Sequence, residues 1–197
     1  MMRTFGATFL FAISLCAAGA SRSKGPCDIY AAANTPCVAA HSTVRALYSA
    51  YTGPLYELQR DTDNATQTVS VDADTGFANA ESQPDFCTPD AYCSIRRIFD
   101  QSGHNNHLVV VNITTEGGGR NKYGWPVRGP NAMRDRVSIG GHSAYSAYFE
   151  GGQGTGSGTM GFRASPGNGT AIEDEPESVY MVVDGHHFSR GCCFVSE

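Results

Sequence analysis

The chain has 197 residues, a formal net charge of −5, and only 17% charged side chains alongside 23 glycines and 9 tyrosines. A moderately acidic balance argues against nucleic acid as a partner, because proteins that bind polyanions carry basic patches. Low charge with many glycines is typical of a loop-rich β protein, and the length suits one hydrophobic core.

The first twenty residues have the pattern of a secretory signal peptide. Arg3 supplies the basic start, residues 5–15 are mostly apolar, and Ala18-Gly19-Ala20 matches the small-x-small cleavage pattern. The apolar run is too short to span a bilayer. We therefore expect a signal peptide at residues 1–20, a mature chain over residues 21–197, a secreted, extracellular location and no membrane partner. A buried N-terminal helix is the alternative.

Removal of the signal peptide would take away Cys16 and leave six cysteines, an even number that suits an oxidising compartment. They fall into three local couples, which are Cys27/Cys37, Cys87/Cys93 and Cys192/Cys193. Local pairing is the simplest arrangement, because short loops cost little entropy to close. The cysteines lack the spacing of a zinc site, so we expect neither a metal nor a cofactor.

The adjacent cysteines, Cys192 and Cys193, are harder to bridge than the other couples. Consecutive Cα atoms lie about 3.8 Å apart, below the roughly 4.4–6.8 Å that a disulfide usually spans. A bond between them would close a strained ring, and such strain often marks a functional site. Otherwise each must pair elsewhere or remain a free thiol.

Three sequons for N-linked glycosylation fit the same compartment. Their asparagines are Asn64, Asn112 and Asn168, each followed two residues later by threonine. We expect all three to lie in exposed loops, because a glycan is bulky and hydrophilic.

One helix and several short strands are predicted along the mature chain. Ser42 or Thr43 can cap a helix, and the apolar residues that follow recur at helical spacing as far as Tyr51. Strands are expected at residues 55–60, 94–99, 107–113, 143–149 and 178–183. The glycine-rich stretch 151–169 has neither the helical nor the strand period and is predicted to be a long loop.

The segment Asp-Gln-Ser-Gly-His-Asn-Asn at residues 100–106 narrows the fold class. Asp100 and Asn105 or Asn106 can bind nearby backbone groups, and Gly103 accepts a positive φ. The segment resembles a hairpin of concanavalin-like and laminin-G-like sandwiches, although it could be a turn without a binding role. We expect an all-β, jelly-roll β-sandwich with one short N-terminal helix.

Several segments, taken in order, resemble glycoside hydrolase family 54, whose members are secreted α-L-arabinofuranosidases. The matching residues are 25–30, 35–42, 45–48, 50–56, 99–103, 106–108, 184–185, His187 and 191–194. The stretches 61–80 and 112–175 match poorly. The resemblance implies a retaining hydrolase that acts on terminal arabinofuranosyl groups of arabinan or arabinoxylan.

The resemblance also implies roles for particular residues. In this family the adjacent cysteines form a disulfide on the wall of the arabinose pocket, so Cys192 and Cys193 are expected to contact substrate. Cys27–Cys37 and Cys87–Cys93 would be structural disulfides. His41, Tyr48 and Asp184 also match family positions, where packing and hydrogen bonding are their simplest roles.

The catalytic carboxyl groups are expected downstream of Glu197. A retaining glycosidase needs two carboxyl groups about 5–5.5 Å apart, and the family's Glu nucleophile and Asp acid/base both follow the adjacent cysteines. The ending Val195-Ser-Glu197 departs from the family pattern, so Glu197 is not assigned to catalysis. The acids of residues 173–177 surround Pro176 and are predicted to form a solvated loop.

We therefore expect an incomplete, monomeric N-terminal portion of the catalytic sandwich, without the family's C-terminal arabinose-binding module. Such a portion would leave sheet faces uncovered, above all at residues 178–183. The alternatives are a non-catalytic, lectin-like secreted sandwich and a small disulfide-stabilised secreted effector.

Overall fold

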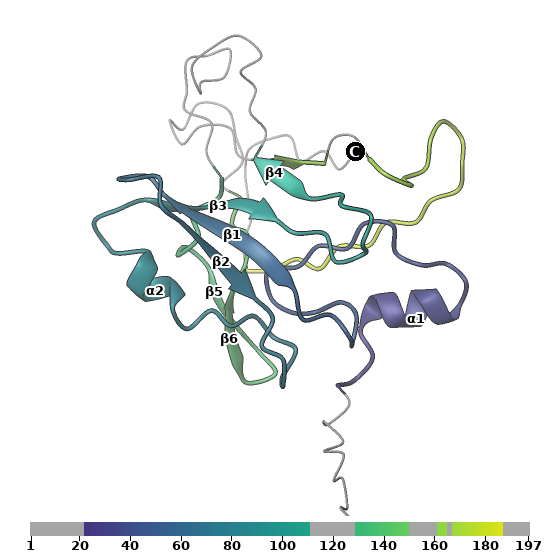
Figure 1. The fold of residues 1–197 in the computed structure, drawn as a ribbon, viewed down its shortest axis with the longest axis horizontal. Coiled ribbons are helices and arrows are strands. Elements are labelled where there is room, and N and C mark those ends of the chain that lie inside the picture. Colours follow the sequence, from purple (N-terminus) through teal and green to yellow (C-terminus); the bar gives the residue numbers. More distant parts are fainter. Residues whose placement is uncertain (1–21, 111–128, 150–160, 165–166, 187–197) are drawn as a thin grey trace, which may run out of the picture.

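A computed structural model describes residues 22–110, 129–149, 161–164 and 167–186. Short strands dominate these residues, with two short helices (Figure 1). The elements are α1 (Pro26–Ala32), β1 (Pro54–Arg60), β2 (Thr66–Ser70), α2 (Gln83–Phe86), β3 (Cys93–Ile98), β4 (Leu108–Val110), β5 (Arg136–Ile139), β6 (His142–Tyr145) and β7 (Phe162–Arg163). None of the helices in these ranges is long and apolar enough to cross a membrane.

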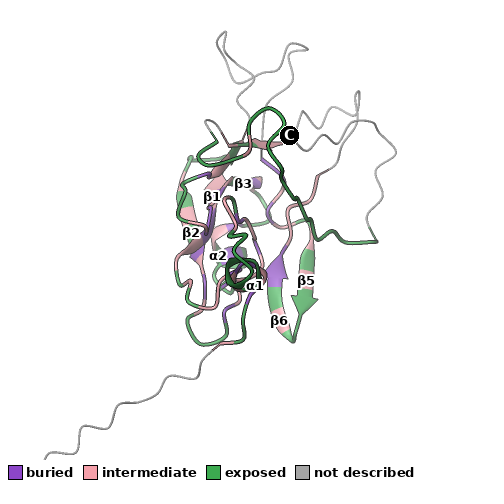
Figure 2. Cartoon of the chain, turned by 90° about the vertical axis from the view of Figure 1, so that its right-hand side faces the viewer, coloured by how far each residue is buried: buried purple, intermediate pink, exposed green. Residues whose placement is uncertain are grey.

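The strands form two antiparallel sheets. The larger sheet has the order β2-β1-β3-β4-β7, and β5 pairs with β6 in a separate hairpin. Figure 2 shows β6 with buried residues and β5 largely exposed, as expected for a hairpin with only one face covered. The structure thus confirms the predicted all-β class.

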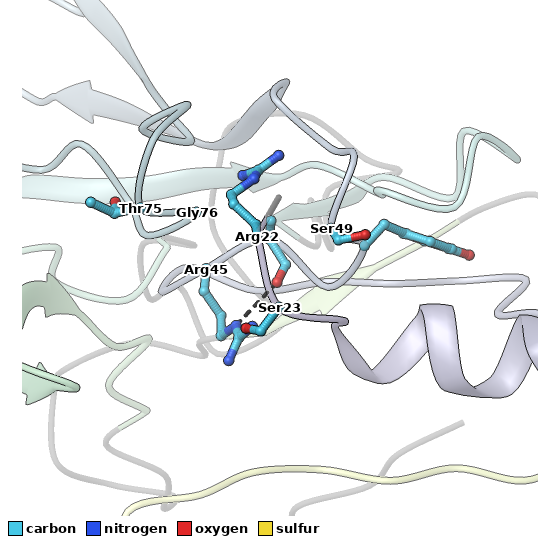
Figure 3. A pocket seen from close by; sticks show the side chains of 8 residues that line it. Arg22, Ser23, Arg45, Ser49, Thr75 and Gly76 are labelled. Carbon is cyan, nitrogen blue, oxygen red and sulfur yellow. Dashed lines mark hydrogen bonds between the residues drawn. The ribbon is translucent and has the colours of Figure 1, made fainter. Parts of the chain in front are cut away.

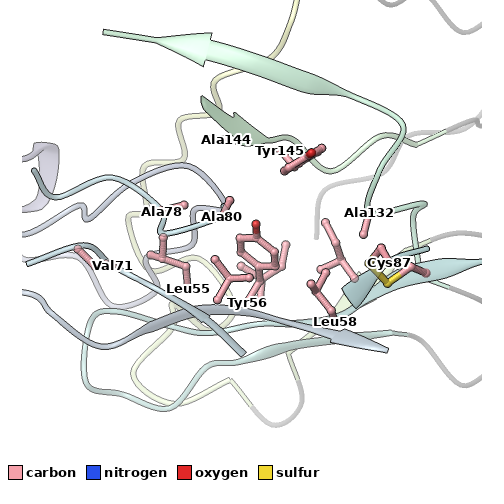
Figure 4. Close-up of a cluster of buried hydrophobic side chains, with 14 of the residues drawn as sticks. Leu55, Tyr56, Leu58, Val71, Ala78, Ala80, Cys87, Ala132, Ala144 and Tyr145 are labelled. Atoms are coloured by element: carbon pink, nitrogen blue, oxygen red, sulfur yellow. A yellow bond between two sulfur atoms is a disulfide. The ribbon is translucent and has the colours of Figure 1, made fainter. Parts of the chain in front are cut away.

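The hydrophobic core lies between the larger sheet and the β5–β6 hairpin. Leu55, Tyr56 and Leu58 of β1 are fully buried, and they share one cluster with Ala144 and Tyr145 of β6 (Figure 4). Two adjacent residues of one strand are both buried because the pairing of β1 with β2 shifts register between Pro54 and Tyr56.

A polar contact is enclosed within this core. The Tyr56 hydroxyl donates to Gln83 Oε1 at 2.6 Å, and Gln83 Nε2 donates to the Ala132 carbonyl at 2.6 Å. Burial raises the pKa of Tyr56, so its hydroxyl keeps the proton that it donates. The pair fixes α2 against the core without leaving these buried groups unsatisfied.

The prediction of a helix after Ser42 is wrong. The helix of this region is α1, which lies earlier in the chain, at Pro26–Ala32. The Ser42 hydroxyl accepts from the backbone N–H of Val44 and of Arg45 and so forms a turn. The next two amides, of Ala46 and Leu47, donate to the Gly76 carbonyl and to Gln101 Oε1. These distant partners leave no amides for a helical ladder.

The helix that does form, α1, has a clear local cause. Pro26 occupies its first turn, where a missing N–H costs nothing, and Asp28 Oδ2 accepts from the Gly25 N–H at 2.8 Å. Asp28 also accepts from the Ser49 N–H at 2.7 Å, and these bonds lower its pKa in spite of the opposing effect of burial.

The strand predictions were confirmed in part. Residues 55–60 and 94–99 correspond to β1 and β3, and the strand predicted at 143–149 is represented by the shorter β6. The strand predicted at 107–113 includes β4, and its residues 111–113 lie outside the described residues. Of the predicted loop 151–169, only residues 161–164 and 167–169 are described, and they include β7, which pairs with β4 at Val109–Arg163 and Val110–Phe162. The strand predicted at 178–183 is absent, because this segment has no backbone partner in the described chain and remains irregular.

Two disulfides join local segments within the described part of the chain. Cys27 pairs with Cys37 and Cys87 pairs with Cys93, with Cα–Cα distances of 5.6 and 5.4 Å. Cys27, Cys87 and Cys93 are almost fully buried, so the bridges also contribute apolar surface to the core.

Asp100, at the end of β3, is the centre of a buried hydrogen-bond network. Its Oδ1 accepts from the N–H of Ala40 and of Ser102, and its Oδ2 accepts from the Ser102 hydroxyl and the Asn106 N–H, at 2.7–3.0 Å. Burial alone raises the pKa of Asp100, but these four bonds outweigh it and the pKa lies below its ordinary value. Gly103 adopts a positive φ of 86°, as predicted for this turn.

A continuous apolar segment lies on the surface near the C-terminal end of the described chain. Val179, Met181, Val182 and Val183 are 69–86% exposed, and Tyr180 is held by ring contact with Tyr30 of α1 at 5.9 Å. Scattered exposed apolar residues are ordinary, whereas five in succession mark a surface that is normally covered.

The Asp100 network predicts an acid-sensitive contribution to stability. Asp100→Asn places an amide N–H₂ where an oxygen now accepts, and we expect a loss of about 2–4 kcal/mol at pH 7. A carboxylate with a lowered folded pKa stabilises above its unfolded pKa of about 3.9, and that contribution disappears as the pH falls through the folded pKa. The gap between parent and variant in urea unfolding should therefore narrow below about pH 4.

The matched control is Asp74→Asn, which removes the same charge from an exposed turn and should change stability by less than about 0.5 kcal/mol. Equal stability of the two variants at pH 7 would contradict the role assigned to Asp100.

The apolar surface segment predicts dye binding by the purified 197-residue chain. Replacement of Val179, Met181 and Val183 by serine should lower the fluorescence of a bound hydrophobic dye several-fold and raise the soluble yield, because exposed apolar surface binds dye and promotes association. Ile172→Ser, at an isolated residue that is 66% exposed, is the control and should change neither. Unchanged fluorescence of the triple variant would show that the dye binds elsewhere.

Candidate functional site

The adjacent cysteines Cys192 and Cys193 lie outside the described residues, as does His187. Among the last described residues before them in sequence is Asp184. Its Oδ1 accepts from the His186 N–H at 2.8 Å and lies 2.8 Å from His186 Nδ1. Both side chains are at the surface. The role of the cysteines as a pocket wall stays a prediction.

His41, one of the family positions, is a structural contact in this part of the chain. Its Nε2 donates to the Asn106 carbonyl at 2.6 Å, because a carbonyl can only accept. Burial lowers the pKa of His41 and outweighs the opposing effects of the Asn106 carbonyl and Asp100. A neutral imidazole therefore fastens the 38–41 loop to the turn that follows β3.

Tyr48, a second family position, lines an open depression together with Ala50, Tyr51, Gln101 and Ser102. The polar groups of this depression are used within the chain. The Tyr48 hydroxyl donates to the Cys37 carbonyl at 3.3 Å, and the Tyr51 hydroxyl donates to the Pro54 carbonyl at 2.6 Å. Burial raises the pKa of both tyrosines, so neither is suited to act as a base.

Gln101 forms the floor of the same depression and was not singled out from the sequence. Its Oε1 accepts from the Leu47 N–H at 2.7 Å, and its Nε2 donates to the Arg45 carbonyl at 3.2 Å. The only signal for it was its place in the Asp-Gln-Ser-Gly turn. The depression therefore offers aromatic surface on a fixed floor rather than reactive groups, which suits contact with a ligand but not bond cleavage.

A second, narrower depression lies beside the start of α1 (Figure 3). Arg22, Arg45, Ser49 and Gly76 are among its lining residues. Arg22 Nη2 donates to the Tyr51 carbonyl at 2.7 Å, and Arg45 Nε donates to the Ala46 carbonyl at 3.1 Å. The two guanidinium groups therefore hold backbone in place.

Several of the described carboxylates are likewise bound to structural partners. Asp63 pairs with Arg60 at 2.6 Å, and Asp72 accepts from the N–H and the hydroxyl of Thr75. The acidic residues 173–177 are exposed, as predicted for a solvated loop. Within the described ranges, no three His, Cys, Asp or Glu side chains gather as a metal site.

Comparison with known proteins identifies relatives along nearly the whole chain. The family model for the catalytic part of alpha-L-arabinofuranosidase B matches residues 26–196. A probable alpha-L-arabinofuranosidase B of Aspergillus terreus is 41% identical over 194 residues, which cover 98% of this chain and 36% of the relative. Alpha-L-arabinofuranosidase B of Aspergillus niger is 43% identical over 177 residues, covering 89% of this chain and 33% of the relative.

Solved structures agree with the sequence relatives. An arabinofuranosidase complexed with arabinofuranosyl-alpha-1,2-xylobiose is 42% identical and superposes with a TM-score of 0.64, over 77% of this chain and 29% of that one. A family 54 α-L-arabinofuranosidase soaked with a cyclic sulfate inhibitor gives the same values.

The chain spans about a third of the length of these curated relatives. Both the family match and the identity extend over most of its residues. The chain therefore belongs to the alpha-L-arabinofuranosidase B catalytic family, glycoside hydrolase family 54.

Proposed function

We propose that this chain is the N-terminal portion of the catalytic domain of a secreted α-L-arabinofuranosidase. The enzyme would release terminal arabinofuranosyl groups from arabinan or arabinoxylan with retention of configuration. The observation that carries the proposal is the family match over residues 26–196. The two disulfides are in keeping with an extracellular location.

The substrate class is supported by the ligand of a related structure. The solved arabinofuranosidase that is 42% identical to this chain binds arabinofuranosyl-alpha-1,2-xylobiose. An arabinofuranosyl group linked to a xylose chain is the kind of side group that arabinoxylan carries. We propose the same class of substrate for the whole protein, namely a polysaccharide with terminal arabinofuranosyl groups. We also propose that the whole protein is a monomer.

The described residues would supply the scaffold of that enzyme rather than its reacting groups. Retention requires one carboxylate as nucleophile and a second carboxyl group as acid and then base, about 5–5.5 Å apart. The carboxylates of Asp28, Asp63, Asp72 and Asp100 hold backbone or arginine partners. We propose that the reacting pair comes from the part of the catalytic domain that follows the adjacent cysteines in longer family members.

In this scheme Cys192 and Cys193 form a disulfide that lies against the sugar. Two polarisable sulfur atoms give a weakly polar face, suited to the less polar side of a furanose ring.

A second candidate function is sugar binding without hydrolysis by this portion of the chain. The depression around Tyr48 and Tyr51 favours it, because the depression presents aromatic rings while its polar groups are engaged internally. Affinity electrophoresis in gels that contain arabinan distinguishes this candidate, since retarded migration without product release supports binding alone.

We predict that the 197-residue chain gives no hydrolysis of an aryl α-L-arabinofuranoside above a buffer blank, because the proposed reacting pair belongs to the part of the catalytic domain that follows the adjacent cysteines in longer family members. Full-length alpha-L-arabinofuranosidase B of Aspergillus niger, assayed in parallel, is the control and should release the aryl alcohol. Steady turnover by the 197-residue chain would show that it contains the reacting carboxyl pair and would contradict our division of roles.

We further predict that the secreted chain contains no free thiol. Labelling with a maleimide under denaturing, non-reducing conditions should leave all six mature cysteines unmodified, and the peptide containing Cys192 and Cys193 should be two hydrogens lighter than its reduced form. A proteolytic fragment that links either residue to Cys27, Cys37, Cys87 or Cys93 would instead indicate separate bridges. Reduced protein, labelled in the same way, is the control.

A further inference from the structure

The two described sequons, at Asn64 and Asn168, are both exposed but differ in their hydrogen bonds. Asn64 lies in the turn between β1 and β2, is exposed, and has a φ of 57°. Within the described part of the chain its side chain makes no hydrogen bond, and Thr66, the third residue of the sequon, is exposed at the start of β2.

The turn around Asn64 is fixed by its neighbours rather than by Asn64 itself. Arg60 pairs with Asp63 at 2.6 Å, and Asp63 Oδ1 accepts from the Ala65 N–H at 3.1 Å. The Arg60 N–H donates to the Ala65 carbonyl at 3.0 Å. The amide nitrogen of Asn64 is thus presented on a formed turn, and a bulky group attached there displaces no contact.

Asn168 is engaged at three points. Its backbone N–H donates to Asn106 Oδ1 at 2.7 Å, its carbonyl accepts from Asn106 Nδ2 at 2.9 Å, and its own Nδ2 donates to the His104 carbonyl at 3.0 Å. Asn106 is 1% exposed and also donates to the Val38 carbonyl at 2.7 Å. Asn168 therefore holds residues 167–170 against the turn after β3.

The rest of this second sequon is folded tightly. A Cβ atom built on Gly167 would lie 2.5 Å from Thr170 Oγ1, so the threonine folds back over the start of the segment. A Cβ atom built on Gly169, where φ is 72°, would lie 3.1 Å from His104 Nδ1. A glycan on Asn168 Nδ2 would start beside His104, at the nitrogen that now makes the contact.

We propose that Asn64 carries an N-linked glycan, whereas Asn168 acts as a structural clamp and stays unmodified in the folded protein. The inference depends on the proposed secretion but not on arabinofuranosidase activity. Transfer forms a bond between Asn64 Nδ2 and C1 of the first sugar of a lipid-diphosphate-linked oligosaccharide. The bond from C1 to the diphosphate oxygen breaks, the lipid diphosphate leaves, and Nδ2 loses one proton.

The test is glycopeptide mapping of the 197-residue chain expressed in a secreting yeast. A second version carries a host signal peptide in place of residues 1–20, so that failure of the native leader is distinguished from failure of glycosylation. Both the medium and the cell-retained pool are mapped, which makes the result independent of folding yield. We expect a glycan on the peptide with Asn64 and a predominantly unmodified peptide with Asn168.

Matched variants separate the two roles. Thr66→Ala abolishes the first sequon without forcing another residue into the left-handed conformation of Asn64, and it should remove the mass of one glycan. Thr170→Ala abolishes the second sequon while preserving the Asn168 contacts, and it should change neither the mass of attached glycan nor Tm. Asn168→Ala should leave the mass of the glycan unchanged but lower Tm by about 2–4 °C, because it removes the bond to His104.

Two results would overturn the proposal. One is a peptide with Asn64 that stays mainly unmodified although the chain has entered the secretory pathway under the host leader. The other is loss of glycan mass in Thr170→Ala, which would show that Asn168 is an acceptor.

Discussion

One buried carboxylate, that of Asp100, determines how the irregular segments of this protein lie against its sheet. A buried charge is tolerated only when its hydrogen bonds are satisfied, and here four donors from Ala40, Ser102 and Asn106 satisfy it. The neighbouring Gln101 binds Leu47 and Arg45 in the same way. Residues 38–48, whose sheet pairing in the described chain is the bridge between Arg45 and Phe77, therefore have a defined path across the end of β3.

The parts of the fold that could be predicted are those with a local cause. β1 and β3 are short segments of mixed apolar and polar residues bounded by turn residues, and the turn after β3 contains a glycine where a positive φ is needed. The predicted helix failed because the apolar spacing from Val44 to Tyr51 reports only which side chains face inward. The partners of that backbone, Gly76 and Gln101, lie far along the chain and leave no local signal.

The residues of the candidate site likewise differ in how far the sequence could predict them. The adjacency of Cys192 and Cys193 marks them in the sequence, but resemblance to a family was needed to give them a role. Resemblance was also needed to single out His41 and Tyr48, since neither has a local pattern that indicates chemistry. What His41 and Tyr48 do in the described structure depends on two carbonyl groups, of Asn106 and Cys37, that only the tertiary fold brings near. Gln101 could not be recognised as a floor residue, because a glutamine after an aspartate is uninformative without the loop that it supports.

The strand order also determines the sequence of events in folding. β1, β2 and β3 follow one another along the chain and lie together in the sheet in the order β2-β1-β3, whereas β4 pairs with β7 across about fifty intervening residues. Local pairing closes small loops and is fast, and pairing across a long loop is slower. During synthesis the first three strands can therefore pair with one another before the segment with β7 has emerged. The β4 edge of that nascent sheet stays open in the interval, and it is the place where a folding helper would be needed.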